Sequence, residues 1–322
     1  MRRREFIALA GASVTWPFAA LAQQPGRTYR IGCLQPVPRD APGLLAFFDG
    51  LRSFGFIEGQ NLTVDYRDYG AHLDLTPKFA TDLVNARVDA IQAAGDPAID
   101  AAQQATTTIP ILGFTDDMAG SGFVTSIARP NGNITGVSIL ATELDGKRQE
   151  ILIEAVPGVS RMAALATNTM PPAKLNALKE AARARNVELS IHQIGSGEEI
   201  EAAIDMAYAS GATALNVLSS PILYFGRRLI MGRVAEIRMP AIYQWPEQAE
   251  EGGFIGYGPS VTQISREISA RLLAKVLRGT KVADIPVEQP TKFELVINLK
   301  TANELGITVP ATLVARADKV IE

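Results

Sequence analysis

The hydrophobic residues of the first part of the chain occur in short runs, separated by longer amphipathic stretches. The runs are almost continuously apolar, as is typical of strands buried on both faces. Between them, apolar residues recur at helical spacing, and in 44–54 they cover one broad face. This alternation predicts a parallel sheet with helices on both sides. The predicted strands are 29–34, 62–66, 90–93 and 109–114, and the predicted helices are 44–54, 75–85 and 97–105.

The same alternation restarts near residue 134, although no repeat is visible residue by residue. An extended segment at 134–140 leads into a long predicted helix at 144–155. We therefore predict an α/β fold of two doubly wound parallel-sheet lobes joined by a hinge. The further predicted strands are 162–166, 187–192, 214–218 and 240–243, and the further helices are 173–185, 198–209 and 222–238.

Two predicted elements follow after the second lobe is complete, a helix at 261–277 and a strand at 293–299. We expect the chain to recross the hinge there. The predicted lobes are 26–136 with about 256–285, and 137–255 with about 286–322.

The first residues have the three-part layout of a signal peptide. Arginines at 2–4 precede an apolar stretch at 6–18, and small residues at 20–22 form a cleavage site. The pattern predicts a signal peptide at 1–22 and a periplasmic protein. The sequence RREF at 3–6 resembles the twin-arginine motif, although export by the general route is as compatible with the pattern. No later apolar run is long enough to cross a membrane.

Composition narrows the function. The formal net charge of the 322 residues is −3. The predicted signal peptide carries three arginines and one glutamate, so removing its +2 leaves −5. A mildly acidic chain without basic runs is a poor candidate for nucleic-acid binding. Cys33 is the only cysteine, and His72 and His192 are the only histidines, so we expect no internal disulfide, no metal site and no cofactor.

The fold predicts where a ligand binds, because doubly wound sheets bind ligands outside the carboxyl ends of their strands. The loops at these ends are rich in small polar and aromatic residues, which suits a cleft that holds an apolar body and fixes its polar ends. The predicted ligand-binding residues are Gln35, Gly95, Asp96, Pro97, Thr115, Asp116, Asn168, Ser219, Ser220, Tyr243 and Tyr257.

Each of these residues also has a structural explanation. Asp96 before Pro97 could be only a helix N-cap, and the serines at 219–220 could be caps as well. The aspartates at 116–117 could be solvated loop charges. Asn168 could serve only its turn, and Tyr243, like Trp245, could be hinge packing. The group is persuasive because every member falls on the same predicted edge.

Four stretches of the chain carry a resemblance to a known family. They are 51–62 (LRSFGFIEGQNL), 105–111 (ATTTIPI), 128–136 (ARPNGNITG) and 287–300 (VEQPTKFELVINLK). They resemble the periplasmic substrate-binding proteins of ABC transporters, in the group that includes tryptophan- and tyrosine-type binders. The resemblance spans about residues 29–321. It implies a type I periplasmic binding protein with a hinge, an ABC permease as partner and no catalysis.

The resemblance also implies cleft positions. The loop that usually reads Gly-Thr-Pro-Ala in the family is here Gly95-Asp96-Pro97-Ala98. The family's other cleft positions correspond to Asp116, Asn168, Ser219, Ser220, Tyr243 and Tyr257.

Two departures from the family bear on the charge of the ligand. Asp96 places a carboxylate where free helix N–H groups could otherwise meet a ligand carboxylate, and Asp117 stands where proline is common. We expect a cationic or neutral ligand, amino acid-like, aromatic or amine-bearing. Arg39 is the alternative, because in the cleft it could pair with a carboxylate.

Two other functions share this pattern. An enzyme of the same sheet class lacks support, because no Gly-x-Gly-x-x-Gly, Walker or Gly-x-Ser-x-Gly motif is present. A ligand-binding partner of a sensory receptor would have the same fold and cleft. The sequence favours a free, monomeric binding protein.

Overall fold

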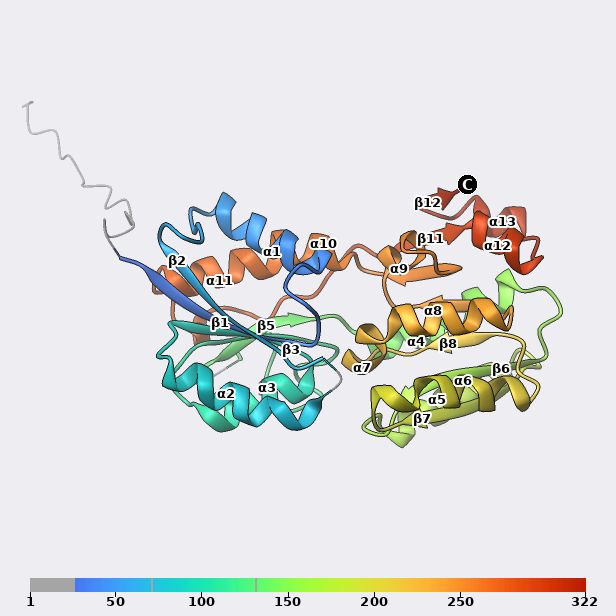
Figure 1. Ribbon diagram of the computed structural model, residues 1–322, viewed down its shortest axis with the longest axis horizontal. Helices are drawn as coiled ribbons and strands as arrows, with labels where there is room; N and C mark the ends of the chain where they lie inside the picture. Colours follow the sequence, from blue (N-terminus) through green and yellow to red (C-terminus); the bar gives the residue numbers. More distant parts are fainter. Residues whose placement is uncertain (1–26, 71, 131) are drawn as a thin grey trace, which may run out of the picture.

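The computed structural model describes residues 27–70, 72–130 and 132–322. The predicted signal peptide lies outside the described residues. Two α/β lobes lie side by side, with the cleft between them (Figure 1). None of the helices in the described part of the chain has the length and apolar character of a membrane span.

The first lobe is a five-stranded parallel sheet with the order β2-β1-β3-β4-β5. Helices α2 and α3 cover one face, and α1 and α11 cover the other (Figure 1). Strands β1, β3, β4 and β5 are almost wholly buried, which explains their largely apolar sequence, whereas the edge strand β2 is mostly half-buried and carries charged residues. The elements are β1 (Tyr29–Gln35), α1 (Pro42–Ser53), β2 (Leu62–Asp68), η1 (Leu73–Leu75), α2 (Thr76–Asn85), β3 (Ala90–Ala94), α3 (Asp96–Ala105), β4 (Ile111–Thr115) and β5 (Ile134–Ser138).

The second lobe is a seven-stranded sheet with the order β12-β11-β10-β9-β8-β6-β7. All its pairs are parallel except that of β10 with β11. Its strands are β6 (Arg161–Thr167), β7 (Glu188–Ile194), β8 (Leu215–Val217), β9 (Ala241–Tyr243), β10 (Ile255–Gly258), β11 (Glu294–Asn298) and β12 (Lys319–Ile321). Its helices are α4 (Ala141–Ala155), α5 (Pro172–Arg183), η2 (Gly197–Glu199), α6 (Ile200–Ala209), α7 (Pro221–Phe225), α8 (Arg227–Glu236), α9 (Pro246–Glu250), α12 (Leu299–Leu305) and α13 (Ala311–Val314).

The chain passes between the lobes three times. The first crossing joins β5 to α4, and the second follows β10. The helix after the second crossing packs on α1 of the first lobe and contains α10 (Val261–Gln263), the π-helical segment η3 (Ile264–Ser269) and α11 (Ala270–Leu277). The chain then passes η4 (Val282–Asp284), and Glu288 pairs with Val137 before the return to β11.

Local details differ from the sequence expectation where packing intervenes. The single helix expected at 222–238 is two helices that meet at Gly226. A side chain at Gly226 would collide with Ile200 of α6. The expected helix at 261–277 contains the π-helical segment η3, and the last residues form α12, α13 and β12, which the hydrophobic pattern did not indicate.

Apolar side chains fill both faces of each sheet. One second-lobe residue, Trp245, belongs to the core cluster of the first lobe, where it meets Phe114 at 6.1 Å between ring centroids. The lobes are therefore joined by apolar packing as well as by the three chain crossings.

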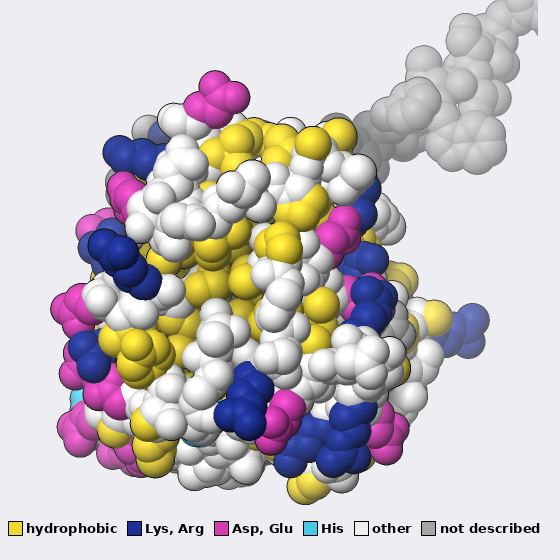
Figure 2. Space-filling view, turned by 90° about the vertical axis from the view of Figure 1, so that its right-hand side faces the viewer, with side chains coloured by type: hydrophobic (Ala, Val, Ile, Leu, Met, Phe, Trp, Pro, Cys, Tyr) yellow, Lys and Arg dark blue, Asp and Glu magenta, His cyan; other side chains and the backbone are white. Residues whose placement is uncertain are grey.

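The far end of the second lobe shows hydrophobic side chains across its middle, with charged ones mostly around the edge (Figure 2).

Candidate functional site

A cavity of about 990 Å³ lies between the lobes, at the carboxyl ends of both sheets. This volume is at the upper end of the range of small-molecule pockets. The first lobe lines it with the ends of β1, β3 and β4 and with α1 and α3. The second lobe contributes the ends of β6 and β8 and the starts of α5 and α7. The edge at which the fold rule places a ligand is thus hollow.

The structure brings most of the predicted ligand-binding residues to this cavity. Asp117, Gln92 and Gln244 line it too. The predicted residues in the lining are Gln35, Gly95, Asp96, Pro97, Thr115, Asp116, Ser219 and Ser220.

Three predicted residues lie outside the lining. Tyr243 is 1% exposed, because its ring is packed in the second-lobe core. Tyr257 packs against another part of that core, and its backbone carbonyl accepts a hydrogen bond from Arg148. The side chain of Asn168 lies beside Gly195, and Thr167 and Thr169 line the cavity from the same loop.

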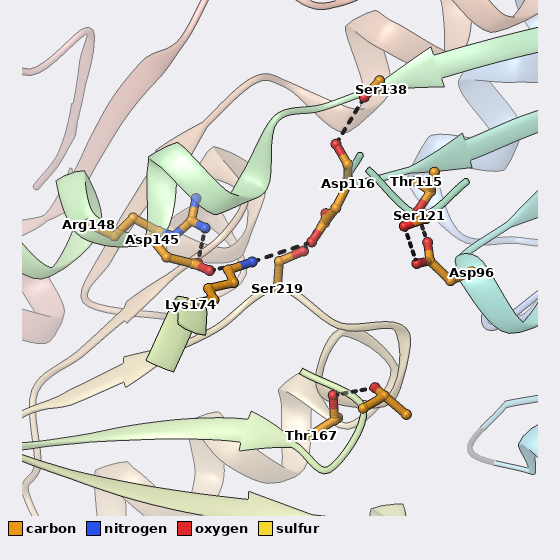
Figure 3. Close-up of polar contacts among 11 residues, drawn as sticks. Asp96, Thr115, Asp116, Ser121, Ser138, Asp145, Arg148, Thr167, Lys174 and Ser219 are labelled. Carbon is orange, nitrogen blue, oxygen red and sulfur yellow. Dashed lines mark hydrogen bonds and ion pairs between the residues drawn. The ribbon is translucent and has the colours of Figure 1, made fainter. Parts of the chain in front are cut away.

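The acidic part of the lining is built around the start of α3. Gly95 has φ 85° and precedes the helix, so Asp96 is the first helical residue and makes no side-chain cap. Its carboxylate instead accepts hydrogen bonds from the hydroxyls of Thr115 and Ser121, the latter at 2.8 Å (Figure 3). Asp117 accepts the backbone N–H of Gly120 at 2.8 Å. The loop after β4 therefore folds back on α3 through carboxylates.

A chain of charges crosses the cleft and joins the lobes (Figure 3). Asp145 and Arg148 of α4 are fully buried and paired with each other. Lys174 Nζ, at the start of α5, lies 2.9 Å from Asp145 Oδ2 and 3.9 Å from Asp116 Oδ2. The Ser219 hydroxyl, also in the second lobe, donates to Asp116 Oδ1 at 2.7 Å. Asp116 of the first lobe is thus held by two groups of the second.

This position changes the acidity of Asp116. Burial between the lobes raises its pKa to about 6, while Lys174 and the Ser219 hydrogen bond act in the opposite direction. Nearby Asp145 and Asp96 add a smaller upward contribution. The second lobe therefore stabilises the ionised form of Asp116, whereas the loss of hydration destabilises it by a larger amount.

Lys174 is one of the lining residues that the sequence analysis missed, because it lies in the first turn of a helix and not at a strand end. A signal for it existed. A cation in the first turn of a helix opposes the helix dipole, so such a lysine needs an anionic partner. Here the partners are Asp145 and Asp116.

The opposite part of the cavity is apolar. Leu44 and Phe47 of α1, Phe114 of β4, Tyr224 of α7 and Val261 of α10 line it. Such a surface suits a flat apolar body, which the acidic end could orient.

The charged residues of the described lining are four aspartates, Asp96, Asp100, Asp116 and Asp117, and one lysine, Lys174. Arg39 is not among them. Its guanidinium pairs with Glu58, and its side chain is 45% exposed. Within the described residues, no three His, Cys, Asp or Glu side chains are grouped as a metal site would require.

A model of the ABC transporter substrate-binding protein family matches residues 32–321. The chain belongs to this family. The match covers nearly all of the described chain and confirms the predicted family. The site is thus the interlobe cleft of a substrate-binding protein.

Individual relatives of this substrate-binding protein agree. A tyrosine-binding protein of Clostridioides difficile (strain R20291) is 26% identical over 267 residues, which cover 81% of this chain and 75% of the relative. A conserved domain protein from Vibrio cholerae has a TM-score of 0.83 at 24% identity, covering 91% of this chain and 100% of that one. A domain from Streptococcus pneumoniae in complex with L-Trp has a TM-score of 0.79 at 23% identity, with the same coverage. These structures confirm the two-lobed α/β fold.

Replacing Asp116 with asparagine tests the cost of burying this carboxylate. Its pKa is about 6 in the folded protein against an ordinary 3.8, so Asp116 contributes stability at low pH that is lost as the pH rises through 6. The Asp116→Asn variant cannot ionise at this position, so it does not lose this stability as the pH rises. Its unfolding free energy relative to wild type should therefore increase by up to about 3 kcal/mol between about pH 4 and pH 7.5, measured by urea unfolding.

Ser219→Ala is the companion variant for this measurement. The Ser219 hydrogen bond lowers the pKa of Asp116, so its removal should raise that pKa further and enlarge the loss of stability with pH. A difference between Asp116→Asn and wild type that stays constant across the pH range would contradict this account of the site.

Proposed function

We propose that this substrate-binding protein captures an amine-bearing small molecule with an apolar body in the interlobe cleft and delivers it to an ABC permease. The observation that carries the proposal is the charge of the lining, four aspartates against one lysine that is already paired. A cleft lined by one sign of charge concentrates ligands of the opposite sign.

The pairing of Lys174 favours the amine over an anion. Its ammonium lies 2.9 Å from Asp145, a carboxylate with no exposure, so an anionic ligand would compete with a buried ion pair. Asp96 and Asp117 remain at the first-lobe side of the cleft. Phe47, Phe114 and Tyr224 supply aromatic surface, which attracts both apolar and cationic groups.

The relatives support the same class of ligand. One relative is named for tyrosine, and one solved structure holds L-Trp. Both compounds combine an amino group and a carboxylate with an aromatic body. The amine and the ring are the features that the acidic and apolar parts of this cleft would recognise.

We also propose that the protein works in the periplasm as a monomer after removal of residues 1–22, with export by the twin-arginine route. The support is the signal-peptide layout of the first residues and the family, whose members act outside the cytoplasm. Mass spectrometry of the exported protein should find a chain that begins near Gln23. A mature mass that still includes the arginines at 2–4 would rule out cleavage.

The charge proposal predicts an order of affinities that calorimetry can measure. Phenethylamine and phenylalanine should bind more tightly than phenylacetate. The affinity for phenethylamine should fall as the salt concentration is raised. Asp117→Asn should reduce amine affinity by about threefold to tenfold, because it removes one unit of negative charge from the lining. Asp49→Asn is the matched control, since Asp49 is 55% exposed on α1 and lies outside the lining.

Two results would overturn the charge proposal. One is that phenylacetate binds most tightly. The other is that amine affinity is equal in wild type, Asp117→Asn and Asp49→Asn.

We also propose that the two lobes close on the ligand by bending at the hinge. Gly95 offers a test of this closure. A side-chain carbon at Gly95 would come within 2.5 Å of Pro221 in the second lobe. Gly95→Ala should therefore oppose closure. It should lower the affinity for the tightest-binding of the three compounds above by more than about tenfold. Small-angle scattering of the ligand-saturated variant should show a larger radius of gyration than wild type.

Gly122→Ala is the control for backbone strain. Gly122 has φ +78° against +85° at Gly95, yet nothing lies within 4 Å of the added carbon. It should lose stability through strain alone and keep the closed radius. Equal effects of the two substitutions on affinity would argue against closure at this contact.

A further inference from the structure

We infer that the cleft contains a second polar subsite, formed by Ser265, Ser269 and Gln244, that binds an uncharged hydrogen-bonding group at the far end of the ligand's apolar body. The inference rests on the proposed function, because it assumes that the interlobe cleft holds the ligand. It concerns the end of the cleft beside the hinge, away from the aspartates.

Two serines of the helix that follows β10 line the cavity with hydroxyls that have no partner among the described residues. Ser269 is 3% exposed and lines the cavity. Its hydroxyl makes no hydrogen bond to any described residue, nor does that of Ser265, which also lines the cavity. Because Ser269 lines the cavity and its hydroxyl has no partner in the described part of the chain, that hydroxyl is free to donate to or accept from a group inside the cavity.

The second lobe supplies a third group of the same kind. Gln244 follows β9, is 8% exposed and lines the cavity, and its amide has no partner among the described residues. The backbone carbonyl of Gln244 lies against Gly258, at the end of β10, where the chain crosses to the helix that carries the two serines. The three groups therefore reach the hinge end of the cavity from both lobes.

The backbone explains how lining residues spread over eight positions of one helix, from Val261 to Ser269, face one cavity. In an α-helix, residues eight apart diverge by about 80° at about 100° per residue. Val261, Ser265 and Ser269 nevertheless all line the cavity. The π-helical segment η3 spans Ile264–Ser269, and its wider turn reduces the divergence. Such π-segments occur frequently at functional sites.

Helix α1 keeps this end open and apolar. Gly43 lines the cavity beside the serine helix, and a side-chain carbon there would meet Val261 at 3.4 Å and the Ser265 hydroxyl at 3.6 Å. Leu44 and Phe47 continue the same wall. None of the lining residues from α1 and the serine helix is charged, so the subsite suits a hydroxyl, an indole N–H or an amide.

The two polar ends lie on opposite faces of the first sheet. Asp96 and Asp100 belong to α3, below the strands in Figure 1, whereas the serines belong to the helix above them. A ligand that meets both ends must cross the carboxyl edge of the sheet. This geometry selects a ligand with an amine at one end of a ring system and a neutral polar group at the other.

Paired ligands that differ by one hydroxyl test the subsite. The pairs are phenethylamine with tyramine, phenylalanine with tyrosine, and phenylacetate with 4-hydroxyphenylacetate, each measured by calorimetry. Wild type should favour the hydroxylated member by about threefold to tenfold, the value of one neutral hydrogen bond. Ser269→Ala should abolish this ratio and leave the affinity of the member without the hydroxyl unchanged. Ser265→Ala gives an independent measurement if Ser269→Ala fails to fold.

Ser121→Ala is the matched control, because it removes a hydroxyl from the acidic end. It removes a hydrogen bond to Asp96 and should preserve the ratio within each pair, whatever its effect on the individual affinities. A ratio of one in wild type, or a ratio unchanged in both Ser269→Ala and Ser265→Ala, overturns the subsite. So does the absence of binding by all three pairs. If only the acid pair binds, the amine proposal fails, and the ratio within that pair still decides the subsite.

Discussion

The burial of Asp145 imposes a requirement that organises the whole cleft. A carboxylate without solvent must be paired, or its loss of hydration exceeds any gain from packing. Arg148, one turn along α4, supplies one partner, and Lys174 of α5 supplies another at 2.9 Å. Lys174 is thereby fixed at the start of its helix, against the helix dipole, with its ammonium directed at the cleft. The position of the one lysine in the described lining thus follows from an interaction inside the second lobe.

The first lobe makes use of this fixed cation. Asp116 comes within 3.9 Å of Lys174 and accepts a hydrogen bond from Ser219, so the loop after β4 meets the second lobe through charge. The raised pKa of Asp116, about 6, shows that this contact only partly offsets burial. A ligand that brought a positive group to Asp116 would further stabilise the carboxylate and offset the remaining cost of its burial. The contact therefore favours closure and still leaves a reason to prefer an amine.

Much of this architecture could be predicted from sequence, because its causes are local. Continuously apolar runs identify strands buried on both faces, and the fold rule then places the residues that follow them, such as Gly95 and Thr115, at the cleft. Tyr243 shows the limit of that rule. It ends a strand like the others, but its ring turns into the core, and alternation along a strand that is apolar throughout does not indicate which face is which.

Other features depend on contacts between distant elements. Glycine is required at position 226, where α7 and α8 meet, because Ile200 of another helix occupies the space of a side chain. Lys174 acquires its role from a carboxylate 29 positions earlier. The π-helical segment η3 is equally hidden, because hydrophobic periodicity indicates which face of a helix is buried and not which backbone groups are hydrogen-bonded. In this protein the sequence locates the cleft, while packing decides which side chains face the cavity.

The recognition groups of the cleft are carried by segments with different mechanical roles. The aspartates lie on α3 and the loop after β4, within the body of the first lobe. The serines lie on a helix that begins three residues after β10 ends and is therefore attached directly to a lobe crossing. A change in the angle between the lobes must alter the path of the chain through Gly258 and so act on that helix. In the proposed complex, the aspartates of the first lobe would bind the charged end of a ligand, and the serines of the helix beside the hinge would bind its other end. The length of the ligand would then affect how far the lobes close.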